Sequence, residues 1–274
     1  MILKDYKVKS LKSDLDYFQL TTNSGNYSGI CLNKNQDMIP KLFIASPIDF
    51  LYGNQVELLK EDHNSVRVIK FRDTCIKYNK QRSLRHALKA WIGHSRGRKS
   101  FHHALSMTDR FVITPNPFCY LEGKMGDSFY ISRFIPFSTN VVNYLREAPS
   151  EKQQVCRKQL AVFLNKAFRC YVYHKDLKGS NILITDSNTK LQFHLIDTED
   201  VAISRKVSSL LLEKSLLRIT RSLVEFFDRQ NLVEFVDACV FNLSVPDKIG
   251  IRRKVVDKAI LIQERLQLQA NSVK

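Results

Sequence analysis

The stretch that decides the fold is HKDLKGSN at residues 174–181, followed by LID at residues 195–197. It contains Asp176, then Asn181 five residues later, then Asp197 at the end of an apolar run. A short polar loop of this kind brings carboxylate and amide oxygens together within few residues of chain. We therefore expect these three side chains to build one polar site.

The residues between the two segments predict a β-hairpin with a polar tip. Ile182-Leu183-Ile184-Thr185 and the apolar run 191–196 are separated by the turn formers Asp186-Ser187-Asn188-Thr189. Folding this hairpin about its turn brings residue 181 opposite roughly residue 194. Asn181 and Asp197 then meet at its open end, next to the loop that carries Asp176.

This constellation is the one that protein-kinase-like phosphotransferases use. One carboxylate orients a hydroxyl, while an amide and a second carboxylate hold Mg²⁺ against a nucleotide phosphate. We assign the first role to Asp176 and metal binding to Asn181 and Asp197, whose hard oxygens suit Mg²⁺. Lys178 is placed to neutralise charge on the transferred phosphoryl group, and His174 to support the loop by hydrogen bonds.

A nucleotide site also needs a lysine from a strand-rich lobe. Lys70 ends the apolar run Val66 to Ile69 and fits that position, although a strand-end lysine can also simply reach water. The sequence has no G-x-G-x-x-G loop, and no Glu lies between Asp73 and Asp109 to pair with the lysine. Either the phosphates are held differently, or activity is weak or lost.

The rest of the chain predicts strands first and helices later. The expected strands are a hairpin of residues 55–60 and 66–71 and two strands at 118–121 and 128–134, with helical stretches at 84–91 and 98–109. Ser150-Glu151-Lys152-Gln153 predicts a capping box. The helix that follows it would bury Val155, Leu160, Phe163, Ala167 and Cys170.

Two more helices complete the predicted second half. One buries Leu212, Leu216, Ile219, Leu223 and Phe226, and the last runs from about residue 247 or 252 towards residue 268. This order indicates an α+β, two-lobed protein-kinase-like fold. Its strand-rich N-terminal nucleotide-binding lobe would span residues 1–134 and its helical C-terminal catalytic lobe residues 135–274.

The composition is typical of a globular protein with a hydrophobic core. The 274 residues are 44% hydrophobic, which allows a sizeable core, and no run approaches the roughly 20 apolar residues of a membrane span. The first residues lack the apolar core of a signal peptide, so we expect an intracellular protein. The six cysteines include no C-x-x-C pair and predict reduced, mostly buried thiols.

The net charge of +16 concerns partners rather than fold. Much of the excess lies between Arg67 and Lys99, which contains eleven cations and the single acid Asp73. The region is either a solvated basic face or a docking surface for an anionic lipid or another polyanion. No motif that reads DNA or RNA accompanies the charge, so we expect no specific nucleic acid partner. The sequence leaves the oligomeric state open.

The motifs, taken in order, resemble the lipopolysaccharide kinases of the Kdo/WaaP type, which are kinase-fold enzymes of bacteria. Residues 173–183 are close to that family's H-R-D-L-K-x-x-N-I-L catalytic loop, with Lys175 in place of the usual Arg. Residues 195–201 resemble its L-I-D-x-x-x-V metal motif. Residues 68–72, 95–98, 113–118 and 217–223 resemble its lysine strand, basic helix, T-P-x-P segment and next helix.

The resemblance implies ATP- and Mg²⁺-dependent phosphorylation of a sugar hydroxyl in the lipopolysaccharide inner core. It implies a cytoplasmic enzyme, peripheral on the inner face of the inner membrane, which would dock through the basic region 67–99. Two alternatives stay open: a kinase-like enzyme acting on protein Ser/Thr, and a non-catalytic pseudokinase or polyanion-binding module. Against the protein-kinase alternative, the sequence after Asp197 contains no segment that ends in A-P-E. Against the non-catalytic alternative, the set of Asp176, Asn181 and Asp197 is complete.

Overall fold

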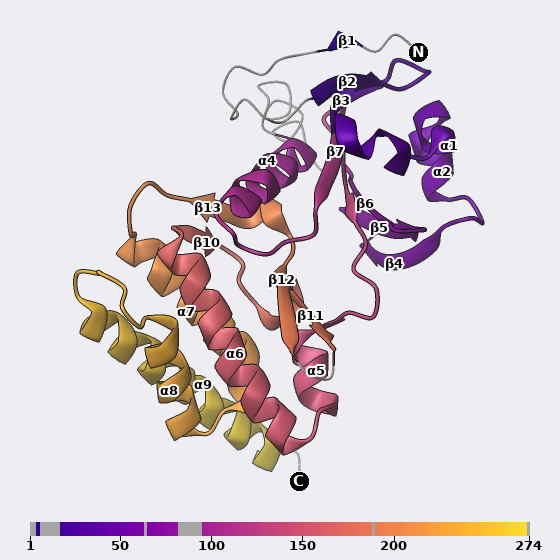
Figure 1. The fold of residues 1–274 in the computed structure, drawn as a ribbon. Coiled ribbons are helices and arrows are strands. Elements are labelled where there is room, and N and C mark those ends of the chain that lie inside the picture. Colours follow the sequence, from indigo (N-terminus) through magenta and orange to yellow (C-terminus); the bar gives the residue numbers. More distant parts are fainter. Residues whose placement is uncertain (1–3, 6–16, 63–64, 82–94, 188–189, 273–274) are drawn as a thin grey trace. The chain divides into compact units, whose positions relative to one another are not determined.

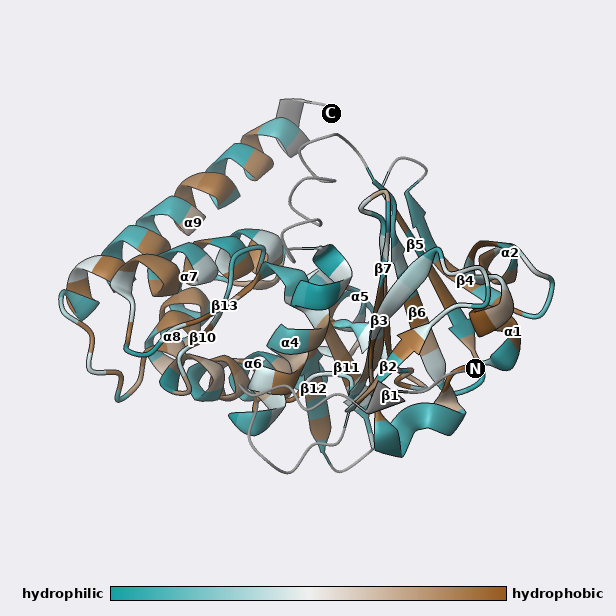
Figure 2. Ribbon diagram, turned by 90° about the horizontal axis from the view of Figure 1, so that it is seen from above, coloured by the Kyte–Doolittle hydropathy of each residue, from teal (hydrophilic) through white to brown (hydrophobic). Residues whose placement is uncertain are grey.

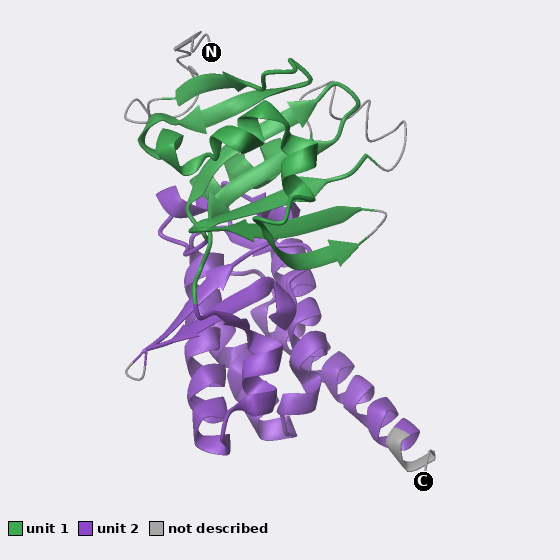
Figure 3. Ribbon diagram, turned by 90° about the vertical axis from the view of Figure 1, so that its right-hand side faces the viewer, with its two compact units in different colours: residues 1–105, 115–136 green, residues 106–114, 137–274 purple. Residues whose placement is uncertain are grey.

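The chain folds into two compact units. The computed structural model describes residues 4–5, 17–62, 65–81, 95–187 and 190–272. Unit 1 comprises residues 1–105 and 115–136, and unit 2 comprises residues 106–114 and 137–274 (Figure 3). The boundary expected after residue 134 lies close to the break after residue 136, whereas the segment 106–114 belongs with the helical unit.

Unit 1 is built on one antiparallel sheet with the strand order β1-β2-β3-β7-β8-β6-β5-β4 (Figure 1). The predicted hairpin is confirmed as β4 and β5, which place Glu57 directly opposite Lys70, and the two later strands as β7 and β8. The strands are β1 (Lys4–Asp5), β2 (Tyr17–Thr21), β3 (Tyr27–Leu32), β4 (Glu57–Asp62), β5 (Val66–Phe71), β6 (Thr74–Asn79), β7 (Pro117–Gly123) and β8 (Ser128–Arg133).

Four strands of this sheet were not predicted, namely β1, β2, β3 and β6. β2 and β3 form a hairpin that extends the sheet beyond β7, which gives the first part of the chain a place in the fold. β6 pairs with β5 and β8 in the middle of the sheet. The sequence of β6 does not indicate a central strand, because it contains the charged residue Lys77, which is only 9% exposed in the structure.

Each face of the sheet is covered by helix, and each cover has its own core (Figure 1). On one face, α1 (Lys41–Ala45) and α2 (Pro47–Leu51) bury Phe43 and Phe50 against Phe129, after the short 3₁₀ segment η1 (Asn33–Met38). On the other face, α4 (Arg96–Asp109) packs Phe101 against Tyr120. α4 confirms the predicted helix at 98–109, whereas the stretch 84–91 lies outside the described residues.

A close approach at Gly97 fixes the start of α4 on the sheet. The Gly97 N–H donates to Ser128 Oγ at 3.0 Å, and a Cβ on Gly97 would lie 2.4 Å from the Phe129 carbonyl oxygen. No side chain larger than hydrogen fits there unless the backbone shifts. This contact orients the helix that covers the face on which Lys77 and Tyr130 pair across strands.

Unit 2 combines two small sheets with a helical layer (Figure 1). Its strands are β9 (Thr139–Asn140), β10 (Val172–His174), β11 (Ile182–Asp186), β12 (Leu191–Leu195) and β13 (Val201–Ile203). Its helices are α5 (Val141–Glu147), α6 (Ser150–Arg169), α7 (Ser209–Leu223), α8 (Arg229–Cys239) and α9 (Lys248–Ser272). Three single turns, η2 (Gly179–Asn181), η3 (Thr198–Asp200) and η4 (Val224–Phe226), complete the unit.

Two details of the predicted α6 were wrong. Pro149 occupies the N-cap and Ser150 is already helical, so the capping box does not form, and Gln153 Nε2 donates to the Ala148 carbonyl instead. Val155 is 46% exposed because the buried stripe starts at Cys156, one position later. The buried residues of α6 are Cys156, Leu160, Ala161, Leu164, Ala167 and Phe168.

The predicted face of the first later helix is confirmed except at Phe226, which lies in η4 after the helix has ended and is only partly buried. Leu212, Leu216, Ile219 and Leu223 are buried on α7, and the final helix is α9. Hydrophobic and hydrophilic residues alternate along the helices of unit 2 (Figure 2), and the buried hydrophobic residues of these helices form one core. In the described ranges, no helix is both long and apolar enough to cross a bilayer. None of the six cysteines, all of which lie in the described ranges, forms a disulfide, and four of them are buried.

Burial of His194 makes the stability of the protein depend on pH. Burial on β12 lowers the pKa of His194 below its ordinary 6.5, and its Nδ1 has no hydrogen-bond partner among the described residues. The unfolded chain therefore binds more protons, so stability present above pH 6.5 is lost as the pH falls through the lower folded pKa. We expect the melting temperature of His194→Gln to fall less between pH 7 and pH 5 than that of the wild type. If calorimetry gives the same fall in melting temperature for both proteins, His194 is not the origin of the pH dependence.

Candidate active site

The open end of the β11–β12 hairpin brings the first two predicted site residues together. The Ile196 N–H donates to the Asn181 carbonyl oxygen at 2.9 Å, and Asp197 follows directly. The main chain of Asn181 and that of Asp197 lie at the same hairpin end, whereas the expected register was wrong. Ile182 pairs with Leu195, so residue 181 lies opposite residue 196 rather than 194, because the turn starts one residue later than assumed.

The end of β12 is held from a second side by the T-P-x-P segment. Thr114 Oγ1 donates to the Leu195 carbonyl at 2.8 Å, and the Leu195 N–H donates to the Ile113 carbonyl at 3.0 Å. Both main-chain groups of Leu195 are therefore satisfied within unit 2. Two hydrogen bonds from the segment 113–114 therefore hold the strand end that precedes Asp197.

His174 ties the loop of Asp176 to that same strand end. Its ring is 1% exposed; Nδ1 accepts the Asp176 N–H at 3.2 Å, and Nε2 lies 3.0 Å from the Ile196 carbonyl oxygen. Since Nδ1 is the acceptor, we assign the proton to Nε2, which donates to Ile196. Ser215 Oγ on α7 donates to the His174 carbonyl at 3.1 Å. His174 thus supports the loop, as its place in the motif predicted.

Replacing His174 tests this supporting role. His174→Ala removes a buried ring and two hydrogen bonds, so we expect a loss of about 2–4 kcal/mol in the free energy of unfolding. Denaturant titration measures this loss. His103→Ala, on α4, is the comparison that removes a half-buried imidazole from unit 1. A His174→Ala protein as stable as the wild type would show that the ring does not hold the loop.

The Asp176 carboxylate is surrounded by donors. Lys178 Nζ lies 3.0 Å from Oδ2, Asn181 Nδ2 lies 3.5 Å from Oδ2, and Arg218 Nη1 lies 3.9 Å from Oδ1. The carboxylate is 38% exposed, so a substrate can reach it. A carboxylate oxygen can accept the proton of a hydroxyl that lies within hydrogen-bond distance of it.

Asn181 is fixed with its amide nitrogen turned towards the loop. Its Nδ2 donates to the Asp176 carbonyl at 2.9 Å, and the residue is 4% exposed. The side-chain oxygen is therefore the atom left to act as a ligand. Asp197 adopts a left-handed backbone with φ 56° and ψ 47°, which few residues other than Gly, Asn and Asp adopt easily.

These groups fit a magnesium ion that is shared with a nucleotide. One carboxylate and one amide oxygen at a hairpin end are hard ligands, and Mg²⁺ completes its shell with water and phosphate rather than a full protein cage. The described part of the chain contains no cluster of three or more His, Cys, Asp or Glu residues arranged for metal. Asn181 and Asp197 would hold the ion.

Arg218 belongs to this site, although sequence reasoning gave it no role. It sits on α7, one turn from Ser215 and Ser222, and Ser222 Oγ accepts the Gly179 N–H at 2.8 Å. The helix therefore touches the loop at three points through residues spaced by threes and fours. The spacing of Ser215, Arg218 and Ser222 in a helix that follows the metal motif could have indicated from the sequence that Arg218 faces the loop.

Lys70 lies in unit 1 and is engaged within that unit. Its Nζ binds Glu57 Oε2 at 2.7 Å and lies 4.7 Å from the centre of the Phe134 ring. The pairing acid was expected after Lys70 in the sequence, but it is Glu57, which precedes Lys70 and lies on the neighbouring strand. Lys77 on β6 shares the same sheet face, because Lys70 is opposite Cys75, two residues before Lys77.

Several cations of the basic region 67–99 are also engaged within unit 1. Arg67 binds Glu61 at 2.8 Å and stacks over Tyr52, and Arg98 Nε donates to the Tyr120 hydroxyl at 3.0 Å. Arg82, Arg85 and Lys89 lie outside the described residues. The described part of the region is therefore less available to a partner than its sequence suggested.

The comparisons with known proteins establish the fold. No protein-family model matches the chain, and no curated protein matches its sequence. WaaP, solved in complex with acyl carrier protein, matches with a TM-score of 0.57 at 14% identity, over 79% of this chain and 92% of WaaP. The PknI kinase domain of Mycobacterium tuberculosis (TM-score 0.45, 11% identity, 77% and 96% covered) and WbdD (0.47, 12%, 74% and 45%) also match.

The match to WaaP confirms the resemblance drawn from the motifs, at the level of the fold. The chain has an α+β protein-kinase-like fold, with a strand-rich N-terminal part and a helical C-terminal part. In that fold a strand hairpin covers the phosphates and the nucleotide lysine stands on the third strand. Here the corresponding order is β4, β5 and β6, followed by α4, β7 and β8.

Proposed function

We propose that the protein is an ATP- and Mg²⁺-dependent phosphotransferase with an alcohol as acceptor. The observation that supports this most strongly is the hydrogen-bonded frame of His174, which joins the Asp176 loop to the strand end carrying Asp197. Phosphoryl transfer gives a use to each of the three polar groups, Asp176, Asn181 and Asp197, that lie at this end of the hairpin.

The proposed roles follow from the geometry. Asp176 accepts the hydroxyl proton as the acceptor oxygen bonds to the γ-phosphorus and the bond to the β–γ bridging oxygen breaks. Lys178 and Arg218, at 3.0 and 3.9 Å from the Asp176 carboxylate, stabilise the charge on the transferred group. Asn181 and Asp197 would hold Mg²⁺, which would supply positive charge to neutralise the phosphates.

For the nucleotide lysine, we propose Lys77 in place of Lys70. β6 is the third strand of the kinase order, and Lys77 is buried on the sheet face that α4 covers. A lysine buried to this degree is retained only where a charge partner exists. Lys70, half-exposed and bound to Glu57, is explained by that ion pair alone.

The two lysines give a matched pair of variants. We expect Lys77→Met to weaken ATP binding and turnover together by about a hundredfold, and Lys70→Met to change them by less than about threefold. Both substitutions remove one ammonium and keep an unbranched side chain on the same sheet face. Single-turnover kinetics with labelled ATP measures both effects. A larger loss in Lys70→Met than in Lys77→Met would show that Lys70 is the nucleotide lysine.

For the acceptor, we propose a sugar hydroxyl of the lipopolysaccharide inner core, with the enzyme peripheral on the cytoplasmic face of the inner membrane. Three findings support this: the motif order, the fold shared with WaaP, and a net charge of +16 that suits an acidic glycolipid. The partly engaged basic region 67–99 would supply only a share of the attraction to an anionic membrane.

The acceptor is tested by offering purified lipopolysaccharide lacking core phosphate and a set of protein substrates side by side with γ-labelled ATP. The proposal predicts label in the lipid sugar and none in protein. Label in Ser or Thr would establish the protein-kinase alternative. ATP binding without transfer to either acceptor would favour a pseudokinase.

A further inference from the structure

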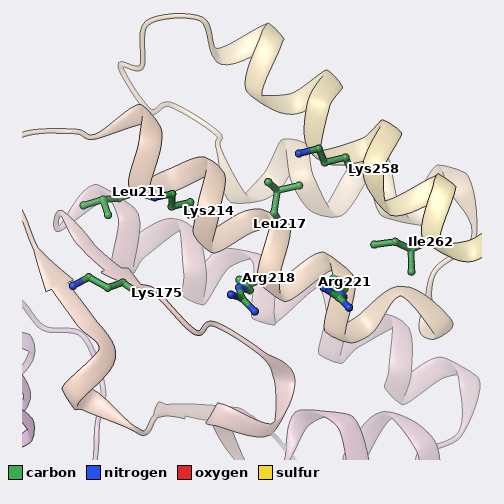
Figure 4. Close-up of a pocket in the computed structure, with 8 residues that line it drawn as sticks. All are labelled: Lys175, Leu211, Lys214, Leu217, Arg218, Arg221, Lys258 and Ile262. Carbon is green, nitrogen blue, oxygen red and sulfur yellow. The ribbon is translucent and has the colours of Figure 1, made fainter. Parts of the chain in front are cut away.

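A basic pocket runs along α7 and α9 in unit 2 and is called the α7–α9 pocket below (Figure 4). Its volume is about 540 Å³, which falls within the range of small-molecule sites. Five of its eight lining residues are cationic and three are aliphatic, and no acid lines it among the described residues. The cations are Lys175, Lys214, Arg218, Arg221 and Lys258.

The helix geometry concentrates this charge. Lys214, Arg218 and Arg221 follow one another by four and three residues and so share a face of α7, while Lys258 reaches the pocket from α9 (Figure 4). Lys175, the residue that replaces the family's usual Arg, enters from the loop. Leu217 and Ile262 add an apolar surface.

Most of the pocket cations differ from a neighbouring lysine in having no ion-pair partner among the described residues. Between the same two helices, Lys254 binds Glu213 at 2.6 Å, so this interface can pair its charges. No ion pair within the described ranges involves Lys175, Lys214, Arg221 or Lys258. Gathering like charges around one cavity costs stability, and a bound anion offsets that cost.

One end of the pocket adjoins the proposed catalytic carboxylate. Arg218 lines the pocket and lies 3.9 Å from Asp176 Oδ1, and Lys175 is the residue before Asp176. A molecule bound here through its anionic groups would present its neighbouring atoms to Asp176. The aliphatic part of the lining suits the carbon skeleton of such a molecule.

We propose that the α7–α9 pocket is the subsite for the acceptor's anionic groups. This rests on the proposed phosphotransferase function and makes it more specific: the acceptor already carries phosphate or carboxylate groups close to the hydroxyl that is phosphorylated. Both chemistries offer charged oxygens that Lys and Arg bind, Arg in a bidentate manner.

Binding is tested without turnover, by isothermal titration calorimetry with pyrophosphate in one arm and citrate in the other. EDTA is present, so that metal-dependent nucleotide binding does not contribute. The test protein carries Lys214→Gln, Arg221→Gln and Lys258→Gln together. The matched control carries Lys158→Gln, Lys166→Gln and Arg169→Gln, three exposed positions on α6 outside the pocket, and loses the same charge. Circular dichroism verifies that each protein is folded.

We expect the wild type and the control to bind the probes alike, and the pocket variant to bind about tenfold more weakly or not at all. Tighter binding of pyrophosphate identifies a phosphate-bearing ligand, and tighter binding of citrate a carboxylate-bearing one. Absence of binding to the wild type overturns the proposal, as does equal weakening in both variants.

The acceptor role is tested by inhibition kinetics on the wild type. Pyrophosphate should compete with lipopolysaccharide and not with ATP, whereas competition with ATP alone would overturn the assignment. The pocket variant should show a raised KM for the acceptor with the KM for ATP unchanged. If the wild type binds pyrophosphate in the pocket but phosphorylates no acceptor, the proposed function fails while the anion site stands.

Discussion

Asp176→Asn is expected to lower the rate of phosphoryl transfer by about a thousandfold while leaving the fold intact. The amide keeps the size of the carboxylate and can keep its contact with Lys178, but it cannot accept the acceptor's proton. The carboxylate is 38% exposed, so its replacement leaves no buried charge unpaired. Initial rates with labelled ATP measure the loss, at saturating nucleotide and metal.

The control for this variant is Asp257→Asn on α9, which neutralises an exposed carboxylate paired with Arg253 in the same unit. It should retain wild-type turnover. Both variants should melt within a few degrees of the wild type. If Asp176→Asn keeps the rate of the control, the carboxylate does not act in the transfer step.

Asp197→Asn should produce an equally large loss by a different route. Removing the one carboxylate of the proposed metal pair should raise the Mg²⁺ concentration needed for half-maximal activity by about a hundredfold. Asparagine adopts the left-handed backbone of this position about as readily as aspartate, so the β12 end should keep its conformation. A magnesium titration of turnover measures the shift.

The metal interpretation requires a specific pattern in that titration. High Mg²⁺ should partly restore Asp197→Asn and should not restore Asp176→Asn, because only the first variant has lost a ligand. Asn181→Ala should resemble Asp197→Asn, with a smaller shift for a neutral ligand. Equal Mg²⁺ dependence in the wild type and Asp197→Asn would place the metal elsewhere.

Much of the site could be predicted because its parts are local in sequence. The loop of Asp176 and Asn181, the hairpin and Asp197 all lie within residues 174–197, and hairpin pairing is decided by the turn between two apolar runs. The register was wrong by two residues, since the position of a turn within a polar stretch is weakly specified.

The parts that were missed depend on contacts between distant segments. Arg218 reaches Asp176 only because α7 packs against β10, and Glu57 meets Lys70 only through strand pairing. Lys77 was overlooked because a lysine in a short strand indicates an exposed edge, whereas this strand is central. No local pattern of residues contains that information.

The first fifty residues show the same limit. β2 and β3 were not predicted because Gly29 and the polar ends of the strands weaken the alternation of apolar residues. In the sheet, Gly29 is required by packing, since a Cβ there would lie 1.9 Å from the Tyr120 carbonyl oxygen. Strand pairing with β7 therefore explains a residue that looked like a strand breaker.

The central claim is that Asp176, Asn181 and Asp197 form a metal–nucleotide transfer site, and binding of Mn²⁺–ATP tests it most directly. Mn²⁺ takes the same oxygen ligands as Mg²⁺ and is observed by electron paramagnetic resonance. We predict one Mn²⁺–ATP per wild-type chain, unchanged affinity in Asp176→Asn, and a loss of about a hundredfold in Asp197→Asn. Wild-type affinity in Asp197→Asn would contradict the account.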